Sequence, residues 1–551
     1  MSQPQYETPP RAGAGTMRAR LPGAGLGLLL AALAAGALFS LPFVHTGAWW
    51  AGLLLLAVLV GAAQRLSPGR AALAGWGFGT GWLAAGTWWI YISLHVYGGL
   101  PAALAVAAVL ALSGGLSLYL ALALGVFARL RRGRPLPDAL LFAALWLLAE
   151  LARGVLFTGF PWLATGYAQV DGPLAGLAPW IGVYGIGAVA AVLASLAAFA
   201  LAPPAAGHGA PSAAGRRRAA LARAGALAAV AAILLLAPLA GRDFSRPSGQ
   251  LAVTLIQTNV AQDDKFAADK MPEALEWLAQ ALQAAPGDLV IAPETAIPLL
   301  PAQLGPEAWQ AFTLPFIAPG TQRAALIGLP LGSFEEGYTN SVAGLSAESG
   351  ASEQRFYRYD KHHLVPFGEF IPTGFRWFTE MMNIPLGDFN RGPLVAPSFG
   401  VRGERVAPNI CYEDLFGEEL ARRFAAGEGA APTVFANVSN IGWFGDTIAI
   451  AQHLHISRMR TMELQRPMLR STNTGATAII DHRGVVQAQL APFTRGTLAG
   501  QVQGREGLTP FVRWASRFGL WPPLLIALAV VVAMGAMAAA AAVGRRPAAS
   551  S

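Results

Sequence analysis

Eight long apolar runs constrain this chain more than any other feature of its sequence. Each run is close to the roughly 20 residues that an α-helix needs to cross the hydrocarbon core of a bilayer. Only 13% of the 551 residues are charged and 54% are hydrophobic, which is too apolar for an ordinary water-soluble protein. We therefore predict a membrane α-helical bundle of eight spans, at about residues 22–40, 46–63, 71–95, 101–128, 137–157, 175–203, 219–241 and 518–543.

Arginine clusters occupy alternate connectors between these runs. They lie between the second and third, the fourth and fifth, and the sixth and seventh runs, and again after the eighth. Basic residues next to membrane spans are retained on the cytoplasmic side. The pattern predicts that both chain ends are cytoplasmic and that residues 243–515 lie on the opposite face. Because the arginines form short clusters between apolar segments, their placement also argues against nucleic-acid binding.

The segment 243–515 holds nearly all the acidic residues, and short apolar stretches alternate there with helical patterns. This alternation is typical of a layered α/β domain. Strands are expected at residues 251–256, 289–292, 325–328, 354–359, 401–410, 433–436 and 476–480, and helices at 271–285 and 449–469. The expected organisation is a cytoplasmic lead (1–20), a seven-helix membrane region (21–242), an outer α/β domain (243–515), a last span (516–543) and a cytoplasmic tail (544–551).

Cys411 is the only cysteine in the chain, so neither an internal disulfide nor a cysteine-cluster metal site is available. An apolar, β-prone run precedes Cys411, and an acidic run with a helical pattern follows it. A thiol on such a strand-to-helix turn lies near backbone N–H groups, which stabilise a thiolate and the charge on an attacked carbonyl. Cys411 is therefore a candidate nucleophile; the alternative is a small buried apolar residue.

Two further residues follow predicted strands and complete a set for acyl transfer. Glu294 follows the strand at 289–292 and can act as the base that a nucleophile requires. Lys361 follows the strand at 354–359 and can stabilise a tetrahedral oxyanion, together with the backbone N–H after Cys411. Glu369 is a second carboxylate that can hold the lysine charged. Taken singly, Glu294 is better explained as a turn or helix-capping acid, and Lys361 as an ordinary solvated lysine.

The contexts of Glu294, Lys361 and Cys411 resemble those of the nitrilase, or carbon–nitrogen hydrolase, superfamily. With membrane helices on both sides, the chain from about residue 20 to 540 resembles the apolipoprotein N-acyltransferase family. Further stretches that carry the resemblance are Phe157-Thr-Gly-Phe-Pro-Trp-Leu163, Ile256-Gln-Thr-Asn259, Tyr338-Thr-Asn-Ser341, Asn437-Val-Ser-Asn-Ile-Gly-Trp-Phe-Gly-Asp446, Gln452-His-Leu-His-Ile-Ser-Arg-Met-Arg460, Glu463-Leu-Gln-Arg-Pro467 and Arg470-Ser-Thr-Asn473.

The resemblance implies an extracytoplasmic nitrilase-like αββα sandwich and a two-step acyltransferase reaction. Cys411 would attack the sn-1 ester of a phospholipid, with phosphatidylethanolamine as the expected donor, to give a thioester acyl-enzyme. The α-amino group of the N-terminal diacylglyceryl-cysteine of a lipoprotein would then accept the acyl chain. Glu294 would act as base and then acid, and Lys361 would stabilise the oxyanion. Family membership also implies roles near the site for Glu369, Tyr412 and Glu413.

The same resemblance implies a bacterial inner-membrane enzyme whose catalytic domain lies in the periplasm. It implies no metal and no diffusible cofactor, and we expect a monomer whose partners are membrane lipid, the phospholipid donor and the lipoprotein acceptor. Phe266 stands where many family members carry tryptophan. The retained aromatic ring predicts contact with an acyl chain or a headgroup.

Several other aromatic residues and histidines have predicted roles. The aromatic and methionine-rich stretch 375–384 is expected to form a mobile lid at the membrane interface, with core packing as the alternative. A loop around Trp443 is a second predicted acyl contact. Four aromatic residues are expected in an interfacial aromatic belt, with a lateral lipid entrance as the alternative; these are Trp82, Trp88, Trp89 and Tyr91. Paired histidines are expected to be structural, because no carboxylate has the spacing of a metal ligand; these are His362, His363, His453 and His455.

Two other functions use the same features. A membrane-anchored nitrilase-type amidase or hydrolase would pass the acyl group to water with the same three residues, although one anchoring span would then suffice. A transporter or receptor would use the outer domain to bind a ligand. The spans hold almost no ionisable residues apart from Glu150, which argues against a transport pathway.

Overall fold

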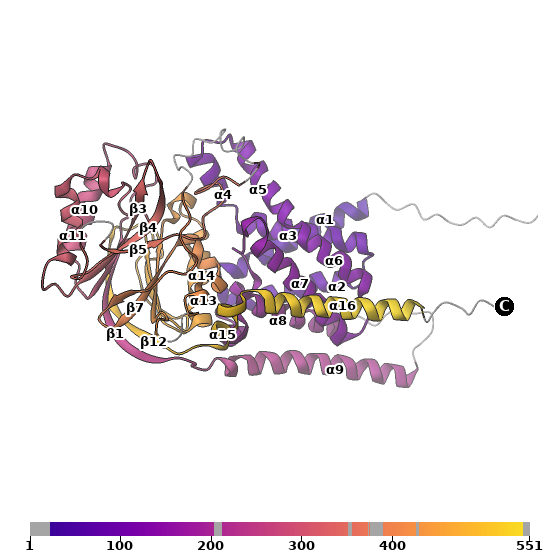
Figure 1. Ribbon diagram of the computed structural model, residues 1–551. Helices are drawn as coiled ribbons and strands as arrows, with labels where there is room; N and C mark the ends of the chain where they lie inside the picture. Colours follow the sequence, from indigo (N-terminus) through magenta and orange to yellow (C-terminus); the bar gives the residue numbers. More distant parts are fainter. Residues whose placement is uncertain are drawn as a thin grey trace, which may run out of the picture.

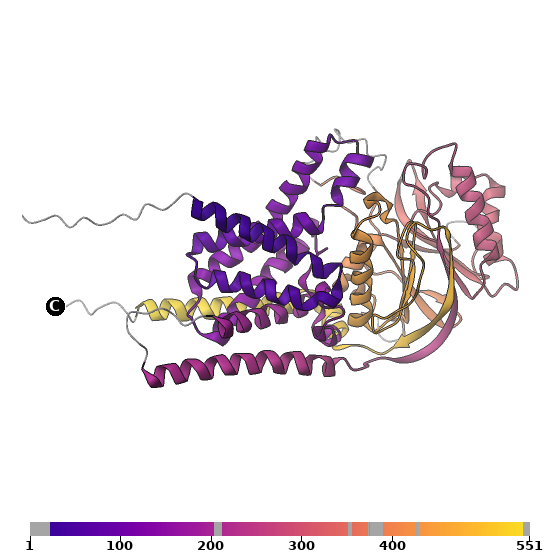
Figure 2. The same cartoon turned by 180° about the vertical axis from the view of Figure 1, so that it is seen from behind.

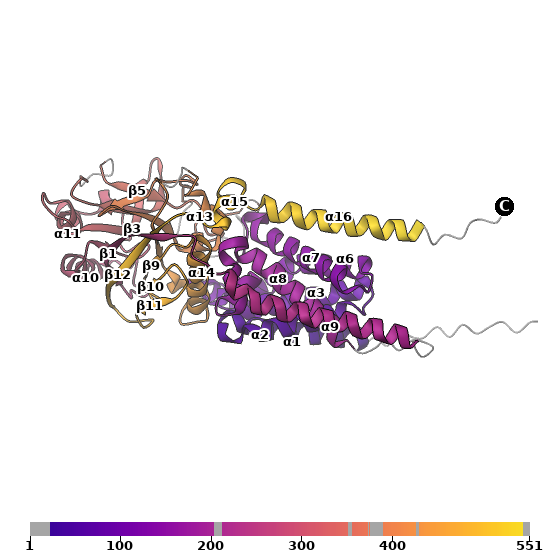
Figure 3. The same cartoon turned by 90° about the horizontal axis from the view of Figure 1, so that it is seen from below.

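The computed structural model describes residues 23–202, 212–350, 355–372, 374, 389–425 and 429–543. A bundle of helices forms one end of the molecule and an α/β domain forms the other (Figure 1). Two long helices, α9 and α16, run along the outside of the bundle and connect it to the α/β domain on either side of that domain in the sequence (Figure 3). The predicted combination of a membrane helical bundle with an α/β domain is confirmed.

Most of the predicted apolar runs are long helices in the structure. Seven helical segments are long and apolar enough to cross a membrane among the residues that the structure describes. The exception is the run 71–95, where α3 ends at Gly86 and short turns follow, so the count of eight spans stays a prediction. The long helices are α1 (Gly23–Phe39), α2 (Trp49–Ala63), α3 (Pro68–Gly86), α5 (Ala102–Leu116), α6 (Leu118–Leu130), α7 (Pro135–Val155), α8 (Ala178–Leu201), α9 (Ala213–Leu236) and α16 (Trp521–Val543).

Glycines bring α1 and α3 into backbone contact. A Cβ atom added at Gly36 would lie 1.9 Å from the backbone oxygen of Phe78, and one added at Gly81 would lie 2.0 Å from that of Leu33. Small residues at helix crossings are how membrane helices approach closely, because lipid supplies no hydrophobic drive for their association. The glycines of α3 lower its apolarity, but they allow it to pack closely against α1 inside the bundle.

The aromatic belt expected at the membrane interface is wrong for two of its tryptophans. Trp82 and Trp89 are almost completely buried. Trp82 stacks on Trp146 with ring centroids 5.9 Å apart and packs edge-on against Phe39 at 5.0 Å. These rings fill the centre of the bundle, where large aromatic side chains contribute much buried area.

The α/β domain contains two six-stranded sheets packed face to face. Their strand orders are β12-β1-β2-β3-β4-β5 and β11-β10-β9-β8-β7-β6. Parallel pairing joins β1 to β2, β2 to β3, β7 to β8 and β8 to β9. The strands are β1 (Arg246–Gln257), β2 (Leu289–Ile291), β3 (Ala324–Ser333), β4 (Gly337–Leu345), β5 (Tyr357–Asp360), β6 (Phe399–Val401), β7 (Glu404–Ile410), β8 (Val434–Ser439), β9 (Met468–Thr472), β10 (Ala478–Ile480), β11 (Val486–Gln489) and β12 (Gly496–Glu506).

Helices cover the outer face of each sheet and complete an αββα sandwich. Helices α10 (Met271–Ala284) and α11 (Pro306–Ile317) pack on the first sheet. Helices α13 (Gly417–Arg422), α14 (Ala449–Leu464) and α15 (Pro510–Phe518) pack on the second. The inner faces of both sheets share a third apolar cluster of aliphatic side chains. The sequence pattern predicted most of these strands, but the helix expected at 449–469 ends at Leu464, and β9 follows.

Helix α14 joins the sandwich to the bundle. One of its faces packs on the second sheet, and Ile456, Met459 and Met462 on another face belong to the same apolar cluster as the bundle core. Figures 2 and 3 show α14 in orange between the sheets and the bundle. Its Gln452 accepts hydrogen bonds from the indole N–H groups of Trp89 (3.1 Å) and Trp162 (2.8 Å). The α/β domain is therefore seated on the bundle by apolar packing and by buried polar contacts.

We predict that Gly36→Ala destabilises the bundle. The new methyl group would overlap the α3 backbone, and overpacking of this kind costs about 1–3 kcal/mol or more. Thermal unfolding of the purified protein, followed by tryptophan fluorescence in detergent, should show a lower midpoint. Gly27→Ala in the same helix is the matched control, because nothing lies within 4 Å of its Cβ position. Equal midpoints for the two variants would contradict the close α1–α3 contact.

Candidate active site

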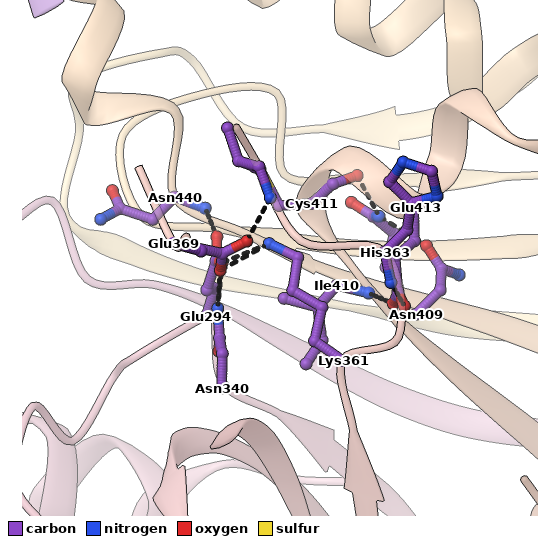
Figure 4. Close-up of polar contacts among 12 residues, drawn as sticks. Glu294, Asn340, Lys361, His363, Glu369, Asn409, Ile410, Cys411, Glu413 and Asn440 are labelled. Atoms are coloured by element: carbon purple, nitrogen blue, oxygen red, sulfur yellow. Dashed lines mark hydrogen bonds and ion pairs between the residues drawn. The ribbon is translucent and has the colours of Figure 1, made fainter. Parts of the chain in front are cut away.

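Glu294, Lys361 and Cys411 lie on three loops that converge between the two sheets (Figure 4). Glu294 follows β2 and Lys361 follows β5, both in the first sheet, whereas Cys411 follows β7 in the second. Side chains at the ends of strands are well placed to form a site in layered α/β folds. The structure thus brings together three residues that lie far apart in the sequence.

The carboxylate of Glu294 is held by three donors. Its Oε1 accepts from the Nζ of Lys361 at 3.3 Å and from Nδ2 of Asn340 at 2.8 Å, and its Oε2 accepts from the backbone N–H of Asn440 at 2.7 Å. A Cβ atom at Gly328 would lie 2.3 Å from the backbone oxygen of Pro293. A glycine at this position therefore lets β3 approach the turn that carries Glu294. The carboxylate is therefore fixed in one orientation (Figure 4).

Lys361 is a buried cation between two carboxylates. Its side chain is 1% exposed, and its Nζ lies 2.9 Å from Oε1 of Glu369 and 3.3 Å from Oε1 of Glu294. Burial alone lowers the pKa of Lys361, but Glu369 and Glu294 outweigh burial and raise its pKa above the ordinary value. Lys361 consequently stays protonated at neutral pH.

Cys411 occupies the sharp turn that its sequence context predicted. Its backbone φ is +50°, in the left-handed region that non-glycine residues rarely adopt, and a short 3-10 turn over Cys411–Leu415 begins there. The residue as a whole is half-buried. Burial of the thiol and the neighbouring Glu294 raise the pKa of Cys411 to about 12, against the opposing effect of Lys361. At neutral pH the resting sulfur is a thiol that requires a base to react.

Glu413 holds the loop of Lys361 and the turn of Cys411 together. Its Oε2 accepts from the backbone N–H of Ile410 and from the hydroxyl of Tyr359, both at 2.7 Å. Its Oε1 accepts from the backbone N–H groups of His362 (2.8 Å) and His363 (3.2 Å). The loop of Lys361 and the turn of Cys411 are thus bonded to one buried carboxylate, which gives the predicted importance of Glu413 a physical basis (Figure 4).

Tyr412 and His363 connect the site to the helical bundle. The Tyr412 hydroxyl donates to the backbone oxygen of Gly159 at 2.9 Å, and Nε2 of His363 lies 3.0 Å from the backbone oxygen of Thr158. Both acceptors belong to the loop after α7, where Phe157, Thr158 and Gly159 all have positive φ. The residue after the candidate nucleophile is therefore bonded directly to the membrane region.

Two predicted substrate contacts lie on neighbouring loops. Phe266 is 38% exposed beside the buried Lys265, and the ring of Trp443 packs edge-on against Tyr97 with centroids 5.5 Å apart. The residues 375–384, predicted to form a lid, lie outside the described part of the chain. Their predicted role, like those of Phe266 and Trp443, stays a prediction.

Sequence reasoning missed Asn340, Asn440 and Lys265 as individual members of the site. Asn340 bonds both Glu294 and Glu369, the latter at 2.7 Å, and the Nζ of Lys265 donates to the backbone oxygen of Glu294 at 3.1 Å. For Asn340 the available signal was an amide between Thr339 and Ser341 in a β-prone run, because a buried amide requires polar partners.

The histidines make structural contacts. His363 stacks on Phe416 with ring centroids 3.5 Å apart, and its Nδ1 lies 3.0 Å from Glu419. Nδ1 of His362 lies 2.8 Å from the backbone oxygen of Gly392. Among the described residues, no group of three or more His, Cys, Asp or Glu side chains is arranged to hold a metal ion.

Alkylation of Cys411 by iodoacetamide tests these electrostatics, and it reports Cys411 alone because the chain has no other cysteine. Only the thiolate reacts, so a thiol with a pKa of about 12 should react about tenfold faster per pH unit from pH 7 to 10, without a plateau. Lys361→Met removes the cation that lowers the pKa of Cys411, and should slow alkylation at least about tenfold. The exposed Lys270 supplies the matched control, Lys270→Met. A plateau near pH 7 in the wild type would contradict this account.

Comparisons with known proteins cover both regions of the chain. The family model for the apolipoprotein N-acyltransferase N-terminal domain matches residues 35–196, and that for carbon–nitrogen hydrolase matches residues 252–510. Among solved structures, a carbon–nitrogen hydrolase from Helicobacter pylori G27 is similar to 50% of this chain over 94% of its own, with 15% identity and a TM-score of 0.34.

Curated relatives align with nearly the whole chain. The apolipoprotein N-acyltransferase of Verminephrobacter eiseniae is 51% identical over 517 residues, which cover 89% of this chain and 92% of that protein. That of Ralstonia nicotianae is 47% identical over 503 residues, which cover 90% and 91% of the two chains. With both regions matched and identity of this extent, the chain belongs to the apolipoprotein N-acyltransferase family, whose α/β domain is a carbon–nitrogen hydrolase domain.

Proposed function

We propose that the chain transfers the sn-1 acyl chain of a phospholipid to the N-terminus of a diacylated lipoprotein through a thioester on Cys411. The single observation that carries this assignment is the convergence of a thiol, a carboxylate and a buried ammonium group at one point between the two sheets. These are the nucleophile, base and oxyanion partner that acyl transfer requires. Membership of an acyltransferase family supports transfer of the acyl chain to the lipoprotein and not to water.

In the first step, the Glu294 carboxylate takes the proton of the Cys411 thiol as the sulfur attacks the ester carbonyl carbon. The raised pKa of Cys411 makes this base necessary, because little thiolate exists beforehand. The Lys361 ammonium and the backbone N–H of Tyr412 stabilise the oxyanion. Glu294 then returns the proton to the glycerol oxygen as the C–O bond breaks, which releases a lysophospholipid and leaves the thioester.

In the second step, the α-amino nitrogen of the lipoprotein attacks the thioester carbonyl carbon. Glu294 accepts a proton from the attacking nitrogen, and Lys361 again stabilises the oxyanion. The C–S bond breaks and the proton returns to sulfur, so the amide leaves and the free thiol is restored. Glu369 keeps Lys361 charged through both steps, because its carboxylate supports the raised pKa of that ammonium group.

The contacts between the catalytic turn and the bundle support a lipid substrate. Tyr412 is bonded to Gly159 of the membrane region, so the nucleophile lies where the α/β domain meets the apolar helices. We propose Phe266 and Trp443 as contacts for the acyl chain or the headgroup. A membrane-anchored amidase or hydrolase would use the same three residues but would pass the acyl group to water.

Intact mass spectrometry tests the acyl-enzyme. Incubation of the wild type with phosphatidylethanolamine should add the mass of one acyl chain, which hydroxylamine removes. Glu294→Gln should form this adduct at least about 100-fold more slowly, because the base is lost. Cys411→Ala is the control and should form none. Adding a diacylated lipopeptide should transfer the chain to its amine. Release only to water would favour the hydrolase, and the absence of any wild-type adduct would contradict the thioester.

We further propose that the membrane is the bacterial inner membrane, with residues 243–515 in the periplasm and both chain ends in the cytoplasm. The beginning of α1 and the end of α16 lie at the end of the bundle opposite the α/β domain, which supports this arrangement (Figures 1 and 2). The arginines that begin α9, Arg216, Arg217 and Arg218, lie at that same end.

Thiol labelling tests this orientation in a Cys411→Ala background. Ala302→Cys, in the α/β domain, should react with a membrane-impermeant maleimide once the outer membrane is permeabilised. Ala214→Cys, in the first turn of α9, should react only after the inner membrane is broken. Both alanines are exposed, so access to each is limited by the membrane. The opposite order of labelling would contradict the proposal and place the α/β domain in the cytoplasm.

A further inference from the structure

A buried histidine that the proposed reaction does not use contacts the backbone carbonyl group of Cys411. Nε2 of His453, on α14, lies 3.3 Å from the backbone oxygen of Cys411. Its Nδ1 lies 2.8 Å from NH2 of Arg470, on β9. His453 and Arg470 are both completely buried, and the indole ring of Trp162 packs beside the imidazole ring.

These two contacts determine the protonation of the imidazole ring. Arginine has donors only, so Nδ1 of His453 must accept the hydrogen bond from Arg470 and carries no proton. Nε2 then carries the proton of the neutral ring and donates it to the Cys411 oxygen. Burial and the guanidinium of Arg470 lower the pKa of His453 well below its ordinary value, which agrees with a neutral ring.

Arg470 is itself held in place by a buried network. Its NH1 donates to the hydroxyl of Ser457 at 2.8 Å and to Oδ1 of Asn437 at 3.2 Å, and it lies 3.5 Å from Oδ2 of Asp414. Ser457 also donates to Asp414. The carboxylate of Asp414 lies 3.9 Å from Nε2 of His453, where it favours a proton on that nitrogen. The histidine therefore has one orientation and one tautomer.

The contact with the Cys411 carbonyl also determines the direction of the next N–H group. A peptide unit is planar and trans, so the C=O of Cys411 and the N–H of Tyr412 point in opposite directions. Nδ2 of Asn437 is a second donor to the same oxygen, at 3.4 Å. Donors that hold and polarise the carbonyl from the protein side make the N–H on the other side a better aligned and stronger donor.

We propose that neutral His453 is a positioning residue, which aims the Tyr412 N–H at the oxyanion by hydrogen bonding the carbonyl of Cys411. The inference rests on the proposed function, in which that N–H stabilises the tetrahedral oxyanion. His453 touches neither substrate nor the reacting atoms; it acts through the Cys411–Tyr412 peptide unit, which directly follows the positive φ of Cys411. Arg470 and Asp414 orient the histidine.

Two amide substitutions separate the two contacts of the histidine. The amide of His453→Gln reaches the position of Nε2 and keeps a donor for the Cys411 oxygen. The shorter amide of His453→Asn reaches only the position of Nδ1, so it keeps a partner for Arg470 and loses that donor. We expect His453→Asn to lower the single-turnover rate of Cys411 acylation by phosphatidylethanolamine about 10- to 100-fold, with an unchanged lipid concentration for half-maximal rate. His453→Gln should recover most of the rate.

Equal acylation rates in the wild type and His453→Asn would overturn the inference. The inference would also be overturned if His453→Asn raised only the lipid concentration for half-maximal rate and left the maximal acylation rate unchanged. Formation of the wild-type adduct, measured in the same experiment, tests the thioester itself, so its absence would count against the proposed function and not against His453 alone.

Nitrogen-15 NMR of the wild-type protein, labelled at histidine, provides a second test. It uses a variant only to assign the resonances of His453. The resonances lost in His453→Gln identify the ring. We expect an Nε2–H tautomer with unprotonated Nδ1 throughout pH 6–8. An imidazolium ion or an Nδ1–H tautomer in this range would contradict the proposed hydrogen bond.

Discussion

The buried ammonium group of Lys361 is the constraint on which the rest of the α/β domain depends. An isolated charge in a dry interior costs many kcal/mol, so Lys361 requires both Glu294 and Glu369 as partners. Those carboxylates come from different loops, and Asn340 of β4 bonds both of them. The first sheet therefore has to present the ends of β2 and β5 and the interior of β4 at one place. The glycine at position 328 permits the close backbone approach that this arrangement needs.

A second set of buried polar contacts joins the domain to the bundle. Gln452 satisfies the indole N–H groups of Trp89 and Trp162, and the Tyr412 hydroxyl satisfies the carbonyl of Gly159. The Trp162 indole N–H and the Tyr412 hydroxyl would lose these partners if the domain separated from the helices, at a cost of about 1–3 kcal/mol per group, whereas the Trp89 indole N–H would keep its bond to the backbone oxygen of Gly86. The contact between the domain and the bundle is consequently continuous with the candidate active site, because Tyr412 directly follows Cys411.

The sequence predicted the parts of the fold that depend on local pattern. Apolar runs of membrane-spanning length and short β-prone stretches were recognised because their periodicity reports burial along the chain. Within the run 71–95, whose glycines allow it to be broken, α3 ends at Gly86 and the chain turns; the glycines of α3 serve helix contact. Trp82 and Trp89 were placed at the interface because tryptophan is common there, but their burial depends on Phe39, Trp146 and Gln452, which only the tertiary structure brings together.

The same distinction applies to the site. Glu294, Lys361 and Cys411 each follow a strand, and strand ends are visible in sequence. The supporting residues lie inside elements: Asn340 in β4, His453 in α14 and Arg470 in β9. A polar residue inside an element has a partner that its sequence position does not identify, and His453 bonds a carbonyl 42 residues away. The candidate nucleophile Cys411, at positive φ, needs such partners, because its strained backbone persists only where surrounding contacts hold it. The second sheet, through Asn437 and Arg470, and helix α14, through His453, thus contribute to the orientation of one peptide unit.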